Sequence, residues 1–398
     1  MTEVKSGVRR GLETNFWISL RSIRATATSS NRHESRGKFE RLPVAETLLV
    51  AAAGAGLLEL IGFPGALVAG SMLAVAVAAL AGRPMRVPLP LARVCFVMVG
   101  MLLGTVVTPQ TLRGIATWPL SVALLMVAVM TMLAGTAGYL RWVHGWQPLS
   151  ALLGASPGSM AQVMALAAEL GADLRGIAIV QVMRVLLIVL GVPAGLAAFG
   201  LAVTPVAPLR AAGAGSFTQL AILAIASTGS ALAMLRLRFP GGLMFGAMFG
   251  AAVLNGSGLV HASLPWWLGS AAVVTLGAVA GARFANTGLR MLLSYLGAAL
   301  GSFAVAGLVA AAFALLVAAL LPLRIADVIV AFAPGAQDTM MVLALTLSLD
   351  PIYVGAHHLV RFLVVSLAIA VAARRFGGRK RAPARRRWQR PGRGAFDD

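Results

Sequence analysis

Two arginines lie deep inside apolar segments of the chain, and they are the residues best placed to do chemistry. Arg184 follows Asp173 by eleven positions, and Arg361 follows Asp350 by the same spacing. Eleven helical residues span about 16 Å, so in a membrane-crossing helix each arginine would lie near the middle of the bilayer. An unpaired cation there costs several kcal/mol. Each arginine therefore needs an anionic or carbonyl partner, either as a structural clamp or as half of an anion-coordinating pair.

A Pro-Gly pair precedes each arginine: Pro157-Gly158 in the first case and Pro334-Gly335 in the second. Proline removes a helix hydrogen-bond donor, so we expect an apolar helix to be interrupted at each pair. The half-helix that follows begins with free backbone N–H groups, which favour anions. A tight turn at a helix entry is the structural alternative, and the recurrence of the pair favours a binding site. The predicted substrate-binding residues are Ser156, Pro157, Gly158, Ser159, Arg184, Pro334, Gly335, Gln337 and Arg361.

The acidic and histidine side chains near these motifs have two predicted roles. Asp173 and Asp350 each come directly before a long apolar helix, where a carboxylate accepts hydrogen bonds from the first N–H groups. We interpret both as helix caps. A histidine beside Arg361 can relay protons near neutral pH, although packing is the more common role of a single histidine. The proton-coupling candidates are Glu169, Asp338, His357 and His358.

The elements that must position these residues are long and apolar. Hydrophobic residues make up 59% of the chain, charged residues 12%, and the mean hydropathy is +0.87. These values are typical of an integral membrane protein. Most of the apolar runs reach the ~20 residues that a spanning helix needs, and they do not alternate as β-barrel strands do. The sequence thus predicts an all-α, polytopic membrane protein. The runs are 45–61, 64–81, 89–108, 118–140, 176–200, 219–235, 266–282 and 292–322.

The chain also contains an internal repeat with an offset of 177 residues. Residues 157–186 align with 334–363, and nine of the thirty positions are identical, including the proline, glycine, aspartate and arginine described above. "FPGALVAGSM" at 63–72 likewise matches "FPGGLMFGAM" at 239–248. Such self-similarity indicates two copies of one unit. The predicted divisions are a basic N-terminal extension (1–41), membrane repeat one (42–200), a linker (201–218), membrane repeat two (219–373) and a basic, disordered tail (374–398).

The loop arginines distinguish two topologies. If all twelve apolar segments cross, six of these arginines fall on each side of the membrane. If the fifth segment of each repeat is re-entrant, nine fall inside and three outside, as the positive-inside rule expects. We therefore predict a bundle of two inverted repeats, with about ten transmembrane helices plus a broken or re-entrant helix in each repeat. Both basic ends are then cytoplasmic in a bacterial inner membrane, where they contact anionic lipid headgroups and not nucleic acid.

The two motifs resemble those of the bacterial AbrB membrane family. They read "SPG…ELGAD…VQVMR" and "APGAQDTMMVLALTLSLDPIYVGAHHLVR", and the resemblance covers roughly residues 45–373. Ala336 stands where the family's second signature often has a glycine, which puts the flexibility of that break in doubt. The family is internally duplicated, and its members are labelled transporters, regulators of gene expression or ammonia monooxygenases. The resemblance therefore implies a fold more sharply than an activity.

The residue types favour a transporter over the other labels. Oxygen chemistry at copper or iron needs clustered histidine and carboxylate ligands, and the five histidines form no such motif. We expect neither an enzyme nor a cofactor. Our leading hypothesis is a secondary transporter or exporter of a small anionic solute, with its site between the repeats. A membrane sensor or regulatory protein that affects gene expression indirectly is the alternative, and a homo-oligomer is compatible with either.

Overall fold

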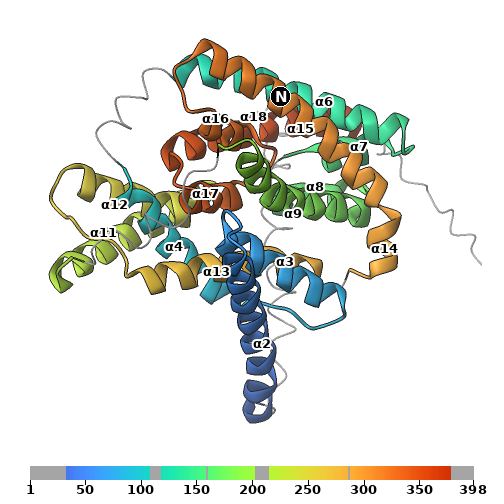
Figure 1. Ribbon diagram of the computed structural model, residues 1–398. Coiled ribbons are helices and arrows are strands. Elements are labelled where there is room, and N and C mark those ends of the chain that lie inside the picture. Colours follow the sequence, from blue (N-terminus) through green and yellow to red (C-terminus); the bar gives the residue numbers. More distant parts are fainter. Residues whose placement is uncertain (1–32, 108–117, 158–159, 202–214, 286, 378–398) are drawn as a thin grey trace, which may run out of the picture. The chain divides into compact units, whose positions relative to one another are not determined.

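The computed structural model describes residues 33–107, 118–157, 160–201, 215–285 and 287–377. Regular structure within these ranges is helical, without strands (Figure 1). The chain divides into two units, Met1–Ala45 and Glu46–Asp398, and helix α2 runs across their boundary. This helix begins at His33, inside the stretch predicted as an N-terminal extension.

The helices of the first half are long and apolar apart from one interrupted segment. Within the described ranges, seven helices of the whole chain are long and apolar enough to cross a membrane, and three shorter apolar helices accompany them. A polytopic helical membrane protein is therefore what the structure shows. The first half contains α2 (His33–Leu60), α3 (Ala66–Leu80), α4 (Leu89–Thr105), α6 (Trp118–Trp142), α7 (Pro148–Ala155), α8 (Met160–Leu170) and α9 (Leu174–Ala198).

The second half presents helices of similar length in the same order. Its α12, which carries four glycines and an asparagine, falls outside the predicted apolar runs. The second half contains α11 (Phe217–Arg236), α12 (Gly242–Gly256), α13 (Trp266–Gly281), η2 (Ala282–Phe284), α14 (Leu289–Ser294), α15 (Leu296–Leu320), α16 (Ile325–Phe332), α17 (Gln337–Thr346) and α18 (Pro351–Gly377).

A break interrupts the apolar segment at both Pro-Gly positions. In the first half α7 ends at Ala155 and α8 begins at Met160; in the second half α16 ends at Phe332 and α17 begins at Gln337. Proline cannot donate the helical hydrogen bond, and the preceding residue is pushed toward an extended conformation. Ala333, which directly precedes Pro334, accordingly has φ −56° and ψ 133°. Each segment is thus two half-helices, and the residue before the proline, Ser156 or Ala333, is extended in both.

Helices of one half pack against helices of the other. Helix α4 lies along α12, α3 along α13, and α6 along α15 (Figure 1). Two glycines of α4 allow the first approach: a Cβ on Gly100 would lie 2.7 Å from the Cβ of Ala247, and one on Gly104 would lie 2.5 Å from that of Ala251. Small residues bring helix backbones together in membranes, where van der Waals packing drives association.

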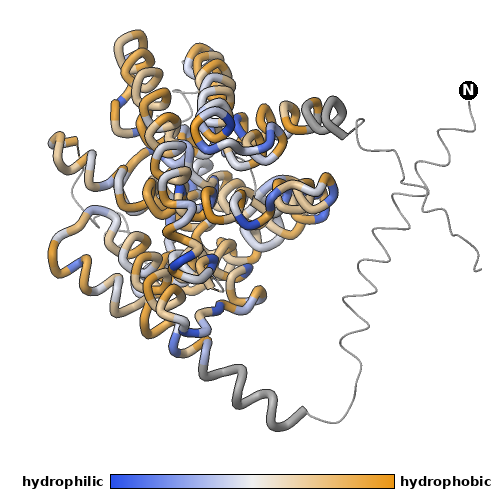
Figure 2. Tube along the Cα trace, turned by 90° about the vertical axis from the view of Figure 1, so that its right-hand side faces the viewer, coloured by the Kyte–Doolittle hydropathy of each residue, from blue (hydrophilic) through white to orange (hydrophobic). Residues whose placement is uncertain are grey.

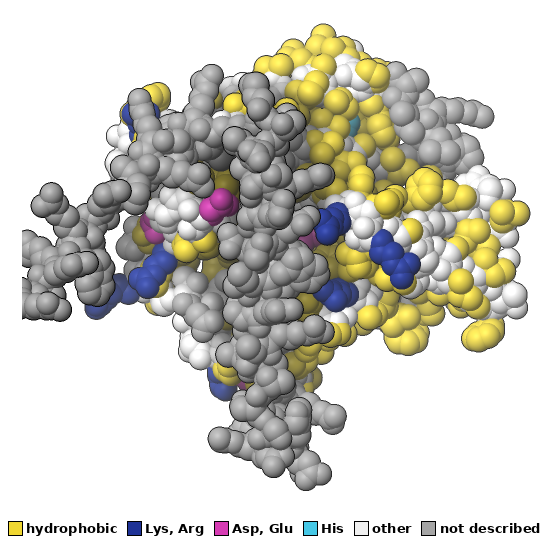
Figure 3. All heavy atoms as spheres, turned by 180° about the vertical axis from the view of Figure 1, so that it is seen from behind, with side chains coloured by type: hydrophobic (Ala, Val, Ile, Leu, Met, Phe, Trp, Pro, Cys, Tyr) yellow, Lys and Arg dark blue, Asp and Glu magenta, His cyan; other side chains and the backbone are white. Residues whose placement is uncertain are grey.

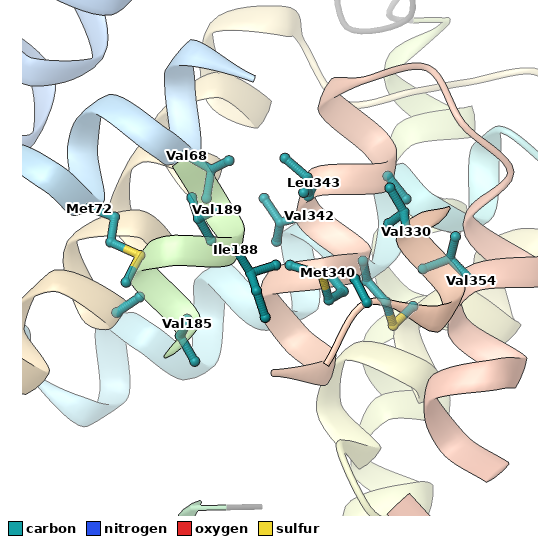
Figure 4. Close-up of a cluster of buried hydrophobic side chains, with 14 of the residues drawn as sticks. Val68, Met72, Val185, Ile188, Val189, Val330, Met340, Val342, Leu343 and Val354 are labelled. Atoms are coloured by element: carbon teal, nitrogen blue, oxygen red, sulfur yellow. The ribbon is translucent and has the colours of Figure 1, made fainter. Parts of the chain in front are cut away.

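The half-helix α17 lies in the core. Eight of its ten residues are buried, and its side chains meet α3, α9, α16 and α18 (Figure 4). Figure 4 shows Val185, Ile188 and Val189 of α9 facing Met340 and Val342 of α17. Beyond its polar first turn, α17 is mostly apolar, as expected of a helix surrounded by protein. Most of the other described helices are hydrophobic along their length (Figure 2). Apolar side chains cover much of the surface seen in Figure 3, as lipid contact requires.

Candidate functional site

Arg184 binds the end of the first half-helix. It lies on α9 with a side chain that is 4% exposed. Its Nη1 donates a hydrogen bond to the carbonyl of Ala155 at 3.1 Å, and its Nη2 donates to the carbonyl of Ser156 at 2.8 Å. The last carbonyls of any helix have no partner inside that helix. Arg184 therefore supplies donors to backbone groups that the break leaves free.

Arg361 does the same at the second break. It lies on α18, is 1% exposed, and donates to the carbonyls of Ala333 and of Gly335, the latter at 2.5 Å. It also donates to Nδ1 of His358. Both arginines thus bind backbone carbonyls at a helix break. The sequence had left both carbonyl and anionic partners open for this clamp. The carboxylates of Asp327 and Asp338 pair instead with Arg324 and Arg283, and Glu169 is exposed.

One turn before each arginine, a second side chain binds the same half-helix. The amide nitrogen of Gln181 donates to the carbonyl of Leu153 at 3.0 Å, and Nε2 of His358 donates to that of Val330 at 3.1 Å. These contacts fix the state of His358. Because Nε2 donates to a carbonyl and Nδ1 accepts from Arg361, the ring carries one proton and is neutral.

Asp173 and Asp350 lie at the starts of α9 and α18. Asp173 accepts hydrogen bonds from the backbone N–H groups of Arg175 and Gly176, both at 3.2 Å. Asp350 accepts from those of Ile352 and Tyr353, at 2.9 and 3.1 Å. This is helix-cap geometry.

The backbone N–H of each cap donates in turn to a side chain on the half-helix before the break, α7 or α16. That of Asp173 donates to Ser150, and that of Asp350 donates to Asp327, which also pairs with Arg324 at 2.7 Å. Burial raises the pKa of the Asp350 carboxyl, and its hydrogen bonds from Tyr353 and Ile352 oppose that rise.

A cavity of about 460 Å³ lies where the two breaks meet α9 and α18. Its volume is within the range of small-molecule sites, roughly 300–1,000 Å³. Residues from both halves of the chain line it, and they include Arg184 and Arg361. The polar part of the lining is completed by Gln181, Arg283, Gln337, Asp338 and His358, and the breaks contribute Pro157 and Gly335.

The cavity carries excess positive charge. Three lining arginines and one lining aspartate give 3 − 1 = +2, with His358 neutral. Arg283 and Asp338 face each other at 3.5 Å. In the described part of the chain, no carboxylate lies within ion-pair distance of Arg184 or Arg361, and the buried Nε of each has no hydrogen-bond partner. Such groups are rare in proteins and call for an explanation.

Not every predicted site residue reaches this cavity. Glu169 is exposed on α8, and Pro334 is buried in the break without lining the cavity. Ser156 is fully buried: its carbonyl binds Arg184, and its Oγ has no partner among the residues described. Gly158 and Ser159 lie outside the described residues.

His357 belongs to a separate polar cluster. Its Nδ1 donates to the carbonyl of Tyr353 at 2.8 Å, so its Nε2 accepts from Ser121 Oγ at 2.9 Å. The Tyr353 hydroxyl then donates to Ser121 Oγ at 2.5 Å, and Trp118 packs edge-on against both rings. The equivalent positions of the other half, 177 residues away, are Ala298, Gly176 and Val180. The cluster therefore joins α6 of the first half to α18 of the second, and the repeat-related positions lack its side chains.

Sequence reasoning missed Arg283 and the aromatic side chains of the lining. Arg283 comes just after an apolar helix, and this position gives no signal that α17 lies beside it. Phe239 stands in the repeated "FPG" motif, which was a usable signal. Among the residues placed by the structure, no group of three or more His, Cys, Asp or Glu side chains is arranged to hold a metal ion.

Comparisons with known proteins agree on one family. The model of the AbrB family, described as "Transition state regulatory protein AbrB", matches residues 67–377. The "Putative regulator AbrB" of Escherichia coli (strain K12) is 26% identical over 330 residues, which cover 78% of this chain and 90% of that protein. The "Uncharacterized protein YhjN" of Bacillus subtilis (strain 168) is 29% identical over 266 residues, covering 60% and 67%. No solved structure matches the chain.

Proposed function

The chain belongs to the AbrB family, and within that family we propose that it is a secondary transporter or exporter of a small anionic solute. The observation that carries this proposal is the pair of buried arginines, Arg184 and Arg361, which come from corresponding helices and line one cavity. Neither has a carboxylate partner in the described part of the chain. A bound anion would supply the missing charge.

The carbonyl contacts make the arginines suitable for this role. Each guanidinium is held by two backbone carbonyls, so its position is fixed before any ligand binds. A carbonyl offers only a partial negative charge, and the full positive charge remains available to an anion. The half-helix α17 adds its N-terminus, where Gln337 and Asp338 line the cavity. Helix N-termini favour anions through their free N–H groups.

Transport requires a site that can face either side of the membrane, and an inverted duplication supports this. We propose that the two halves are inverted repeats, each with five crossings and one broken helix, and that they rock about the cavity. The matching helix order supports the proposal. So does the packing between the halves, in which α3 lies against α13 and α4 lies against α12. In this arrangement both basic ends are cytoplasmic in a bacterial inner membrane, next to anionic lipid. We propose no catalysis and no cofactor.

The positions of two proton-coupling candidates support that role. His358 and Asp338 both line the cavity. A proton on Nδ1 of His358 would face the donor that Arg361 now directs at it, so protonation would oblige Arg361 to move. A proton on Asp338 would release Arg283. Glu169 and His357 lie away from the cavity lining and are weaker candidates.

Flux into liposomes tests the proposal. We expect a candidate anion to accumulate in vesicles that contain the purified protein, and Arg184→Ala and Arg361→Ala to abolish the flux at a temperature at which circular dichroism shows each variant to be folded. Arg175→Ala is the matched control, because this exposed arginine lies on the same helix as Arg184. Normal flux in both site variants would refute the assignment. Labelling of single cysteines at 175 and 324 from each side tests the inverted arrangement, which requires 175 inside and 324 outside.

A membrane sensor is the second candidate, favoured by the regulatory names of the family model and of the Escherichia coli relative. Its basic C-terminal tail would engage a partner and affect gene expression indirectly. Deletion of residues 376–398 separates the two functions. A sensor loses its output when the tail is removed, whereas a transporter keeps its flux. A homo-oligomer is compatible with both.

A further inference from the structure

Different elements supply the polar part and the apolar part of the cavity wall. Helices α9, α17 and α18 supply most of the charged and amide groups. Helices α4, α11 and α12, with the turn between the last two, supply only apolar groups. That apolar wall consists of Phe96, Leu235, Phe239, Pro240, Leu243 and Met244, together with the backbone of Gly241 and Gly242.

The apolar wall is built close to the polar one. Gly241 has φ +65°, a conformation that favours glycine, and a Cβ there would lie 2.9 Å from the amide nitrogen of Gln337. The turn therefore approaches the first residue of α17 more closely than a side chain would allow. Phe239, two residues earlier, packs edge-on against Phe245 with ring centroids 6.0 Å apart. This contact holds the turn against the start of α12.

From these features we infer that the transported solute is an amphipathic organic anion, a carboxylate carried on an aliphatic or aromatic body. The inference rests on the proposed function and names its substrate class. A carboxylate suits the two guanidinium groups, which bind planar oxygen pairs and still carry unpaired Nε–H groups. The apolar body would cover the phenylalanine and leucine side chains and remove them from water, which a hydrated ion would not do.

The volume of the cavity argues against a small inorganic anion. About 460 Å³ corresponds to roughly fifteen water molecules at ~30 Å³ each. Sulfate or phosphate would fill a small part of this space and leave the apolar wall against water. A dicarboxylate without an apolar body would match the charge of +2 but would likewise leave that wall uncovered. An amphipathic carboxylate satisfies the charge and the wall together.

Thermal unfolding of the full-length protein in nanodiscs tests the substrate class with 4-phenylbutyrate as the probe. We expect 4-phenylbutyrate to raise the unfolding temperature in a saturable way, since a ligand that binds only the folded state stabilises it. The neutral amide 4-phenylbutyramide should not, and sulfate and succinate should bind at least about tenfold more weakly. Phe239→Ala should weaken 4-phenylbutyrate about tenfold and leave sulfate unchanged, because a buried phenyl group contributes at least one factor of ten. The matched control is Phe217→Ala, because Phe217 is exposed.

The possible results separate the substrate class from the function. If sulfate or succinate binds as tightly as 4-phenylbutyrate and Phe239→Ala changes nothing, the amphipathic class is wrong and anion transport stands. If no anion is stabilising and no anion crosses the membrane, both proposals fall. An anionic lipid has the same chemistry, so the titration is repeated with and without phosphatidylglycerol in the nanodisc. Loss of the 4-phenylbutyrate effect in its presence would assign the cavity to a lipid headgroup and overturn the inference.

Discussion

Replacing Arg361 by methionine tests whether this side chain holds the second helix break together. Methionine keeps a long apolar side chain but donates no hydrogen bond. The carbonyls of Ala333 and Gly335 and the Nδ1 of His358 would each lose a donor. A buried acceptor left without a partner costs about 1–3 kcal/mol, so three cost about 3–9 kcal/mol. Removing a buried cation without a carboxylate partner offsets part of this loss.

The comparison with Arg184→Met removes that uncertain offset. Arg184 also carries one buried charge, but it binds two carbonyls and no histidine. The same reasoning gives a loss of about 2–6 kcal/mol, with a similar offset for the charge. Arg361→Met should therefore be more destabilising than Arg184→Met by one acceptor, about 1–3 kcal/mol. Both variants should be less stable than wild type.

The free energy of unfolding in detergent, measured by denaturant titration, provides the comparison. Arg175→Met is the control, since the Arg175 side chain is exposed at the start of the same helix as Arg184. We expect this control to unfold with the wild-type protein. If Arg361→Met were as stable as Arg175→Met, the carbonyl contacts would not hold the break, and the clamp would have to be abandoned. If Arg361→Met and Arg184→Met lowered the free energy of unfolding equally, the hydrogen bond to His358 would contribute nothing to stability, and the carbonyl contacts would still hold the break.

Three further predictions concern packing and polar satisfaction in the described helices. Ser121→Ala leaves the Nε2 of His357 and a tyrosine hydroxyl without a partner, so the free energy of unfolding should fall by about 2–6 kcal/mol; an unchanged value would rule out this network. Gly104→Ala puts a methyl group against α12 and should cost about 1–3 kcal/mol, whereas Gly229→Ala, where the space is open, should cost nothing. An equal thermal shift in the two alanine variants would contradict this. Asp350→Ala should lower the free energy of unfolding by about 1 kcal/mol, while Asp350→Asn, which can still cap α18, should lower it less.

The elements that could be predicted from the sequence are those with a strong local physical cause. The spanning helices follow from hydropathy, and the breaks follow from proline. The importance of Arg184 and Arg361 follows from their depth, because a charge in hydrocarbon must have a partner. The sequence could not decide between carboxylate and carbonyl partners, since that depends on which helices pack together.

The parts of the site that escaped prediction are long-range in origin. Glu169 seemed suitable by residue type, yet it is exposed because the apolar face of α8 points elsewhere. Arg283 joins the site through a helix contact fifty-five residues along the chain. The adjacent histidines point to different helices: His358 contacts α16, and His357 contacts α6. Adjacent helical positions lie about 100° apart, so chain proximity gave no information about their partners.

The carbonyl clamp also affects how the chain can vary. A backbone carbonyl is present whatever side chain the residue carries, so the positions that bind Arg184 and Arg361 are free to change their side chains without losing the contact. The two breaks of this chain illustrate that freedom, because Ser156 and Ala333 occupy equivalent positions and each accepts from its arginine. Substitutions on the acceptor side should thus be tolerated where size allows, while even lysine, with a single nitrogen, should fail on the donor side.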